Sequence, residues 1–590
     1  MMKWIYILLF SVVFFVDGFS TQIFVASDGN DSNPGTIGQP LQNISTAVGM
    51  AQAGDTIFVR GGVYSLLTTI SISKSGSQNN MYHLLAYQDE RPLLDFSSMP
   101  VSSSNRGVKL SGSYWYVKGL DIMGAGDNGM NMSGSNNIIE FCSFYKNSDT
   151  GLQIGGGASN NKIINCDSYF NEDPGQGNAD GFAGKLDVGT NNYFYGCRAW
   201  QNSDDGWDGY LRGTDDVSTT LENCWSFANG YLRTGSASSG NGNGFKMGGS
   251  DDKTLKHNFT LKNCLSFDNR VKGFDQNNNK GSMILYNCTG YRDGTNYSII
   301  SALDTGKVAV LINCDVLGNF GSLGSFVDQQ TDSWLSPFNV TNGDFVSTDT
   351  AGVRGPRKSD GSLPDIEFMH LAAGSDLIDA GTDVGLPFNG TAPDLGAFET
   401  GSTVPVELTS FSASVSGNEV ILSWTTASEI NNYEFEIQKK FNNSDFKTIG
   451  FVHGSGTTTE KNKYQFISKN VEEGTNIYRL KQIDFSGTFS YSDEVEINFS
   501  APAEFKLLQN YPNPFNPTTT ISFSVTEKAP VSLKIYNMLG ELVASLINNE
   551  LKEPGNYLVN FNANNLSSGI YIYILRQGGN ILPRKMTFLK

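Results

Sequence analysis

The segment NSDDGWDGY, residues 202–210, holds three aspartates within five positions. Carboxylates this close repel one another unless a positive charge lies among them. An Asp-Asp-Gly segment by itself is usually a solvated turn, but two similar segments nearby change that interpretation. ADGFAGK at 179–185 adds another aspartate, and NGNGFKMGG at 241–249 has a lysine at the matching place of a repeat. The candidate site therefore consists of Asp180, Asp204, Asp205, Asp208 and Lys246.

A cluster that offers only carboxylate oxygens is suited to a hard cation, and a flexible, partly exposed cluster suits Ca²⁺ better than Mg²⁺. We therefore predict calcium as the cofactor. A lysine one strand away from such a metal can have its pKa lowered by burial and by the charge of the metal, whereas the aspartates raise it. In its neutral form that lysine is a competent base for proton abstraction.

The elements that position these residues are indicated by a repeat of roughly 25 residues with one cysteine in each copy. An aromatic residue follows the cysteine by three positions in six of seven copies, and an asparagine follows it by five in six of seven. Such self-similarity without a helical periodicity predicts a parallel β-helix whose coils stack at about 4.8 Å. One cysteine per repeat indicates a small core position rather than a disulfide framework, although export would permit disulfides. The predicted columns contain Cys142, Cys166, Cys197, Cys224, Cys264, Cys288 and Cys314, and Asn147, Asn171, Asn202, Asn229, Asn269 and Asn319.

A glycine-aromatic pair sets the register between coils: DGF at 180–182, DGW at 205–207, NGF at 243–245 and KGF at 272–274. The residues before the glycine are expected to stack in the order Asp180, Asp205, Asn243 and Lys272. The residues after the aromatic ring form a second column of Ala183, Asp208, Lys246 and Asp275. Four carboxylates then fall on two adjacent coils, with the lysine one coil further along.

ADGFAGK, NSDDGWDGY and NGNGFKMGG, in this order on a β-helix, resemble the family nine polysaccharide lyases, the pectate lyase group. The resemblance extends over roughly residues 22–400, because the segments that begin FVASDGNDSNPGT and MHLAAGSDLIDAG look like the flanks of that family. It implies a right-handed parallel β-helix that cleaves a pectic polyuronate by β-elimination, either homogalacturonan or the rhamnogalacturonan backbone. It also implies that Lys246 is the proton-abstracting base and that Ca²⁺ is held by Asp180, Asp204, Asp205 and Asp208.

The chain has 41 basic and 59 acidic residues, a net charge of −18, which excludes binding of nucleic acid through the overall field. An acidic sugar must then be bound by a metal ion or by local cations, for which the nearby candidates are Arg233, Lys272 and Arg270.

Two alternative functions stay open. A β-helix glycoside hydrolase would also use clustered aspartates, but the Gly-His-Gly element of the polygalacturonase type is missing. A non-catalytic carbohydrate-binding protein or adhesin would explain the columns, but not the convergence of four carboxylates and a lysine.

The remaining segments predict export and two further domains. Residues 1–20 combine a basic start, a short apolar run and small residues near the end, which is typical of a signal peptide. After a lyase domain at 21–402, alternating strands at 403–502 resemble a fibronectin type III β-sandwich. Residues 503–590, with the segment YPNPFNP, resemble the C-terminal sorting domain of type IX secretion and form a second small sandwich. We therefore expect an all-β monomer that the type IX machinery secretes or anchors at the cell surface.

Overall fold

The described part of the chain is almost entirely β-structure. The computed structural model describes residues 21–590 except 359–360, 402–407, 417–418, 428, 443, 459–460, 470, 485–488, 500–501 and 553. The predicted signal peptide at 1–20 lies outside the described residues. Helical structure in the described ranges consists of one α-helix, α1 (Ile44–Met50), and one 3₁₀ turn, Asn342–Asp344. The prediction of an all-β protein is confirmed.

Two compact units make up the chain, residues 1–403 and residues 404–590. Among the helical residues that the structure describes, none forms a helix long and apolar enough to cross a membrane.

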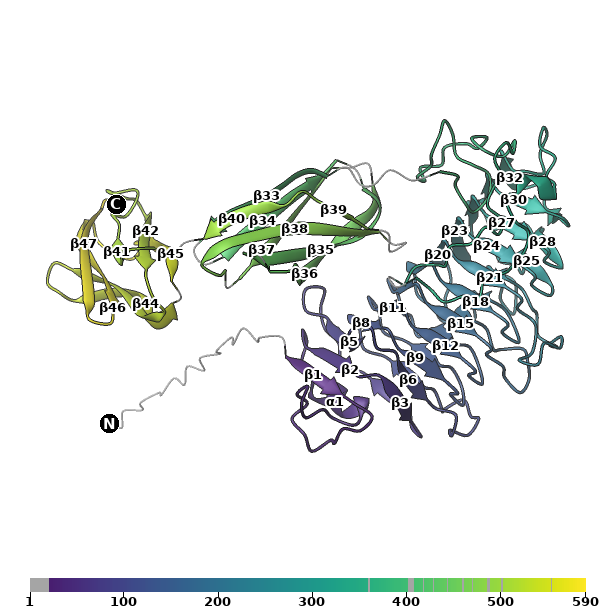
Figure 1. The fold of residues 1–590 in the computed structure, drawn as a ribbon, viewed down its shortest axis with the longest axis horizontal. Helices are drawn as coiled ribbons and strands as arrows, with labels where there is room; N and C mark the ends of the chain where they lie inside the picture. Colours follow the sequence, from purple (N-terminus) through teal and green to yellow (C-terminus); the bar gives the residue numbers. More distant parts are fainter. Residues whose placement is uncertain are drawn as a thin grey trace, which may run out of the picture. The chain divides into compact units, whose positions relative to one another are not determined.

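The first unit is a parallel β-helix made of three sheets, and its coils follow one another from purple to teal in Figure 1. A twelve-stranded sheet runs from β1 (Gln22–Val25) to β32 (Val327–Gln330), and a ten-stranded sheet runs from β3 (Gly62–Ser65) to β30 (Asp315–Leu317). The third sheet, which we call the site sheet, consists of β4 (Ile70–Ile72), β7 (Val108–Leu110), β10 (Met130–Met132), β13 (Leu152–Ile154), β16 (Phe182–Gly184), β19 (Trp207–Asp208), β22 (Phe245–Lys246), β25 (Lys272–Asp275), β28 (Thr295–Ile299) and β31 (Gly321–Leu323). Between β2 (Thr56–Val59) and β31, each coil adds one strand to each sheet, so the predicted β-helix is confirmed.

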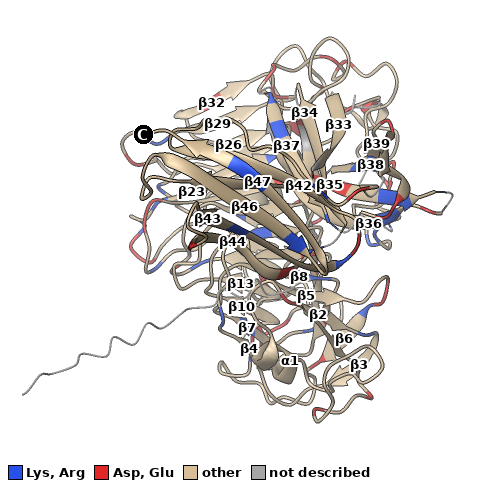
Figure 2. Ribbon diagram, turned by 90° about the vertical axis from the view of Figure 1, so that its left-hand side faces the viewer, with Lys and Arg blue, Asp and Glu red and all other residues tan. Residues whose placement is uncertain are grey.

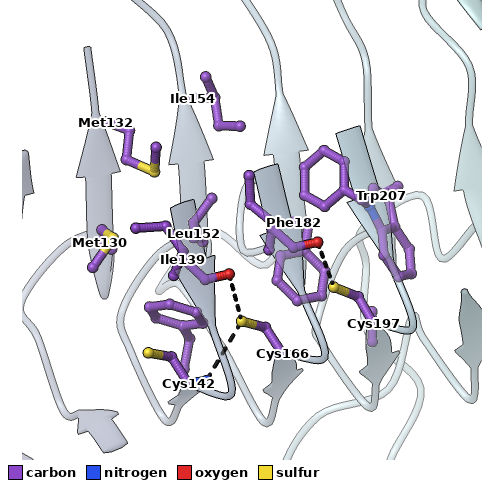
Figure 3. Packing of buried hydrophobic residues seen from close by; sticks show 14 of the residues in the cluster. Met130, Met132, Ile139, Cys142, Leu152, Ile154, Cys166, Phe182, Cys197 and Trp207 are labelled. Carbon is purple, nitrogen blue, oxygen red and sulfur yellow. Dashed lines mark hydrogen bonds between the residues drawn. The ribbon is translucent and has the colours of Figure 1, made fainter. Parts of the chain in front are cut away.

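The seven cysteines stack inside the coils, and all are buried and free. The thiol of Cys166 donates to the carbonyl oxygen of Ile139 on the preceding coil at 3.6 Å (Figure 3). Cys142 and Cys197 occupy the equivalent places on the coils before and after it. Each cysteine therefore acts as a small hydrophobic side chain with a weak donor, which confirms a repeated core position in place of disulfides.

A ladder of aromatic rings lies beneath the site sheet. Its rungs are 4.9 to 5.3 Å apart between ring centroids and come from Phe182, Trp207, Phe245, Phe274 and Tyr297. Trp207 is 2% exposed and Phe245 is 1% exposed, so neither ring can stack on a sugar. The ladder holds the register of the strands, and the neighbouring residues on each strand point to the opposite, outer face.

A column of buried asparagines lines one internal turn of the coils. The side-chain amide of Asn147 donates to Asn171 Oδ1 at 3.0 Å, and that of Asn171 donates to Asn202 Oδ1 at 2.9 Å. The same bond links the next coils, from Asn202 to Asn229 and from Asn229 to Asn269. Because an amide both donates and accepts, stacked amides satisfy one another.

The prediction that Asn319 continues this column is wrong. Asn319 is exposed, and the column ends one coil earlier at Asp293. Asp293 Oδ1 accepts from the side chain of Asn269 at 2.9 Å and so takes the place that an asparagine has in the earlier coils. The repeat loses its regularity where few coils remain to cover the turn.

The second unit contains two pairs of antiparallel sheets, each with its own apolar core. The first pair consists of β33 (Leu408–Ser416), β34 (Glu419–Thr426) and β37 (Asn462–Ser468), and of β35 (Glu429–Phe441), β36 (Lys447–Thr458), β38 (Gly474–Asp484), β39 (Phe489–Tyr491) and β40 (Val495–Phe499). The second pair consists of β41 (Lys506–Leu507), β42 (Thr518–Val525) and β45 (Gly555–Asn562), and of β43 (Ala529–Asn537), β44 (Leu542–Lys552), β46 (Gly569–Gln577) and β47 (Asn580–Phe588). These small antiparallel sheets agree with the predicted fold class.

Candidate active site

The candidate residues lie on three neighbouring strands of the site sheet and on the turns that precede them. β16 pairs with β19 so that Ala183 is opposite Asp208, and β19 pairs with β22 so that Asp208 is opposite Lys246. β22 pairs with β25 so that Lys246 is opposite Asp275. The stacking predicted from the glycine-aromatic register is confirmed.

Asp180, Asp205 and Asp208 form the centre of the cluster. One carboxylate oxygen from each aspartate lies within 4.8 Å of an oxygen from each of the other two. All three side chains are buried. Lys246 Nζ lies 3.0 Å from Asp205 Oδ2 and 3.2 Å from Asp208 Oδ1. The structure thus brings the predicted lysine and three of the four predicted aspartates into one cluster.

Asp204 is buried beside this group but is not one of the three clustered carboxylates. Its Oδ1 accepts from the backbone N–H of Asn241, a bond that ties the turn of Asp204 to the loop before β22. Burial raises the pKa of Asp204 to about 9, and Asp205 and Asp180 add to the shift. A metal-ligand role for Asp204 stays a prediction.

Burial and mutual repulsion control the charges in the cluster. Burial raises the pKa of Asp180 to about 7, with Lys185 opposing the shift and Asp208 adding to it. Burial also raises the pKa of Asp205. The pKa of Asp208 is lowered, because Lys246 and Lys185 outweigh the effect of burial. Burial by itself would lower the pKa of Lys246, but Asp205 and Asp208 outweigh it and raise this pKa well above its usual value.

The buried Asp205 Oδ2 depends on a cation for its partner. Lys246 Nζ lies 3.0 Å from it and forms an ion pair with it. A buried carboxylate is unfavourable unless a positive charge lies beside it. Three carboxylates within 4.8 Å are also the all-oxygen donor set that Ca²⁺ prefers. The residues present therefore fit a hard cation.

A second lysine, which the sequence analysis did not single out, lies in the same cluster. Lys185 follows β16, and its Nζ lies 2.6 Å from Asp180 Oδ2 and 3.6 Å from Asp208 Oδ2. Burial by itself would lower the pKa of Lys185, but Asp180 and Asp208 outweigh burial and raise it. The sequence contained a signal for this position: Ala183 shares the outer face with Asp208, and the alternation of a strand returns Lys185 to that face two residues later.

The three cations predicted to contact substrate have partners within the protein. Arg233 donates to backbone carbonyl oxygens at 2.7 and 3.0 Å, and Arg270 donates to the carbonyl oxygen of Gly240. Lys272 Nζ pairs with Asp275 Oδ1 at 2.9 Å. In the ribbon of Figure 2, lysine and arginine positions in blue and aspartate and glutamate positions in red are scattered among one another. Substrate contact by these three residues stays a prediction.

A parallel β-helix with carboxylates and lysines clustered on one outer face suits a polysaccharide lyase, and known proteins of this class match the chain. Residues 23–313 match the family model described as Pel9A-like, right handed beta helix region. The chain belongs to this Pel9A-like family. Residues 509–588 match the secretion system C-terminal sorting domain, which marks a protein that is secreted or held at the cell surface.

The relatives cover most of the first unit. Pectate lyase L of Dickeya dadantii (strain 3937) is 37% identical over 397 residues, which span 65% of this chain and 92% of that protein. Pectate lyase L of Paenibacillus polymyxa (strain SC2) is 40% identical over 388 residues, which span 62% and 84%. Among solved structures, pectate lyase Pel9A has 37% identity and a TM-score of 0.61, covering 65% of this chain and 97% of that chain. A rhamnogalacturonan lyase has 26% identity and a TM-score of 0.55, covering 61% and 98%. The predicted resemblance to family nine lyases is confirmed.

Proposed function

We propose that the protein is a pectate lyase that cleaves polygalacturonate by β-elimination, with Ca²⁺ as cofactor and Lys246 as base. The observation that carries this proposal is the position of Lys246 Nζ, 3.0 Å from Asp205 and 3.2 Å from Asp208 within the carboxylate cluster. The relatives named pectate lyase, at 37% and 40% identity over the β-helix, support polygalacturonate as the substrate.

Asp180, Asp205 and Asp208 would hold the calcium ion, with Asp204 as a fourth candidate. Bound calcium supplies positive charge that neutralises the C6 carboxylate of the sugar and acidifies the proton on C5. Lys246 accepts that C5 proton, the bond between C4 and the glycosidic oxygen breaks, and a double bond forms between C4 and C5. One proton leaves C5 and one joins the departing oxygen, so the reaction consumes no water.

Lys246 can act as a base only after it has lost its own proton. The neighbouring carboxylates raise its pKa well above the usual value. Positive charge placed among those carboxylates opposes this effect, and burial opposes it as well. Lys246 is therefore a better base with the metal site filled than without it, and the reaction should depend on calcium.

The test is the ultraviolet absorbance of the 4,5-unsaturated product when the full-length protein meets polygalacturonate, with Ca²⁺ or with a chelator. We expect absorbance to rise with Ca²⁺ and to stay flat with the chelator. New reducing ends without this absorbance would indicate a hydrolase instead. Binding of the polymer without any cleavage would favour a carbohydrate-binding protein.

The rhamnogalacturonan backbone is the second candidate substrate. It is favoured by the likeness to a solved rhamnogalacturonan lyase, at 26% identity and a TM-score of 0.55. The 37% identity to pectate lyase Pel9A favours polygalacturonate over it. The same absorbance assay, run in parallel on the two polymers, decides between them.

The remaining segments serve the delivery of this enzyme. The sorting domain implies an interaction with the secretion machinery. We assign residues 403–502 to a fibronectin type III-like spacer between the lyase domain at 21–402 and the sorting domain at 503–590, in a protein that acts as a monomer.

A further inference from the structure

Lys185 has no part in the proposed reaction, yet it is one of two lysines buried among the site carboxylates. Its side chain is 8% exposed, and its Nζ lies 2.6 Å from Asp180 Oδ2 and 3.6 Å from Asp208 Oδ2. Lys246 contacts Asp205 and Asp208 instead. The two ammonium groups therefore divide the three carboxylates between them, and Asp208 is shared.

The contacts of Asp180 identify what an incoming cation has to displace. Asp180 Oδ1 accepts from the backbone N–H of Asp205 at 3.2 Å. Its Oδ2 accepts from the hydroxyl of Thr150 at 3.1 Å and from Lys185 Nζ at 2.6 Å. Asp180 Oδ2 thus accepts two hydrogen bonds, so a metal ion that binds through Oδ2 competes with the Lys185 ammonium. Two positive charges in one small buried space also repel each other.

We infer that Lys185 is a built-in cation that occupies the position between Asp180 and Asp208 and weakens calcium binding by competing for these two carboxylates. The inference rests on the proposed calcium site. In the metal-free protein the Lys185 ammonium holds the carboxylates together, and calcium binding displaces it. The site is then ordered before the metal arrives and releases the metal more readily than a cluster of bare carboxylates.

The experiment is titration calorimetry of the metal-free, full-length protein with calcium chloride. Lys185→Gln, which removes the charge, should bind calcium roughly tenfold or more tightly than the original protein, because affinity follows the net charge of the ligand set. Lys272→Gln is the matched control, since Lys272 pairs with Asp275 rather than with the three clustered carboxylates. We expect this control to change the affinity by less than about threefold.

An equal or weaker calcium affinity of Lys185→Gln overturns the inference and leaves the proposed calcium site in place. Absence of calcium binding in the original protein overturns both. Lys185→Arg keeps the positive charge and should bind calcium no more tightly than the original protein; tighter binding by this variant also contradicts competition by charge.

Thermal unfolding keeps the test decisive if Lys185→Gln is unstable without metal. A ligand that binds only the folded state raises the unfolding temperature, and at a given ligand concentration tighter binding gives a larger rise. Calcium should therefore raise the unfolding temperature of Lys185→Gln more than that of the original protein, since the ion replaces the missing ammonium. A rise that is equal or smaller overturns the inference.

Discussion

The asparagine column and the carboxylate cluster are built on the same coils and behave in opposite ways. In both, polar side chains from adjacent coils are stacked and buried. Asn171 and Asn202 satisfy each other through a hydrogen bond of 2.9 Å between their amides. Asp180 and Asp205 stack on the same two coils, but burial raises the pKa of both, and the charges of the other aspartates add to the shift.

The difference follows from the hydrogen-bonding chemistry of the two side chains. An amide donates and accepts, whereas an ionised carboxylate only accepts. The asparagine column therefore needs no bound ion or ligand and contributes to stability. The carboxylate cluster needs positive charge, which Lys185, Lys246 or a metal ion can supply. In this repeat, sites for chemistry arise where stacked polar residues cannot satisfy one another.

Replacement of the proposed base should have the largest effect. Lys246→Ala should lower kcat/KM on polygalacturonate by roughly 10³-fold, since a positioned general base typically contributes about 10²–10⁴-fold. Initial rates of product absorbance in the presence of Ca²⁺ measure this change. Because the asparagine column is untouched, the thermal unfolding of the calcium-loaded variant should stay close to that of the original protein. An active Lys246→Ala would refute the assignment of the base.

Asp205→Asn tests the cluster side of the comparison. It keeps the shape of the side chain but removes one charge from the three clustered carboxylates. Loss of a residue that only supports a metal ligand typically lowers metal affinity by roughly 10–100-fold. Asp205 is itself a proposed ligand, so calorimetry should show a larger fall in calcium affinity than this. The matched control is Asp293→Asn, the same change at the end of the asparagine column, which should leave calcium affinity unaltered. Equal calcium affinities of the two variants would contradict the distinction between column and cluster.

Asp293→Asn tests the asparagine column. It should have the smallest effect, a modest increase in the free energy of unfolding. Burial raises the pKa of Asp293 to about 8, against about 3.9 for an unfolded aspartate. The folded state therefore holds the proton more tightly, and its stability falls as the pH rises from about 4 to about 8. An asparagine carries no such proton, and its amide can donate to Ser266 as Asn269 does.

Urea unfolding at about pH 4, 7 and 9 measures this effect. The variant and the original protein should be equally stable near pH 4, and the variant should be more stable by at least about 1 kcal/mol at pH 9. A difference that does not change with pH would show that Asp293 is not the titrating group.

Much of the candidate site could be predicted because the repeat converts sequence spacing into spatial register. The glycine-aromatic pairs place Asp208 opposite Lys246, and the strand pairing confirms that placement. The position of Asp204 could not be predicted in this way, because it lies in a turn whose carboxylate bonds to the next loop at Asn241. Lys185 was missed because the prediction followed residues beside the aromatic rings and did not extend the alternation by two positions.

The sequence by itself determined most of the residues that stack, with Asn319 as an exception, since a repeat with one strand per sheet leaves little freedom in register. Three short motifs in order on such a repeat also indicated the class of enzyme, and the pectate lyase relatives support it. Only the tertiary structure decided which stacked groups are paired: that Lys185 binds Asp180, that Lys246 pairs with Asp205 Oδ2, and that Asn319 is exposed. The physical reason is that side-chain pairing depends on distances of a few ångströms across coils and loops, which the backbone path sets and residue spacing does not.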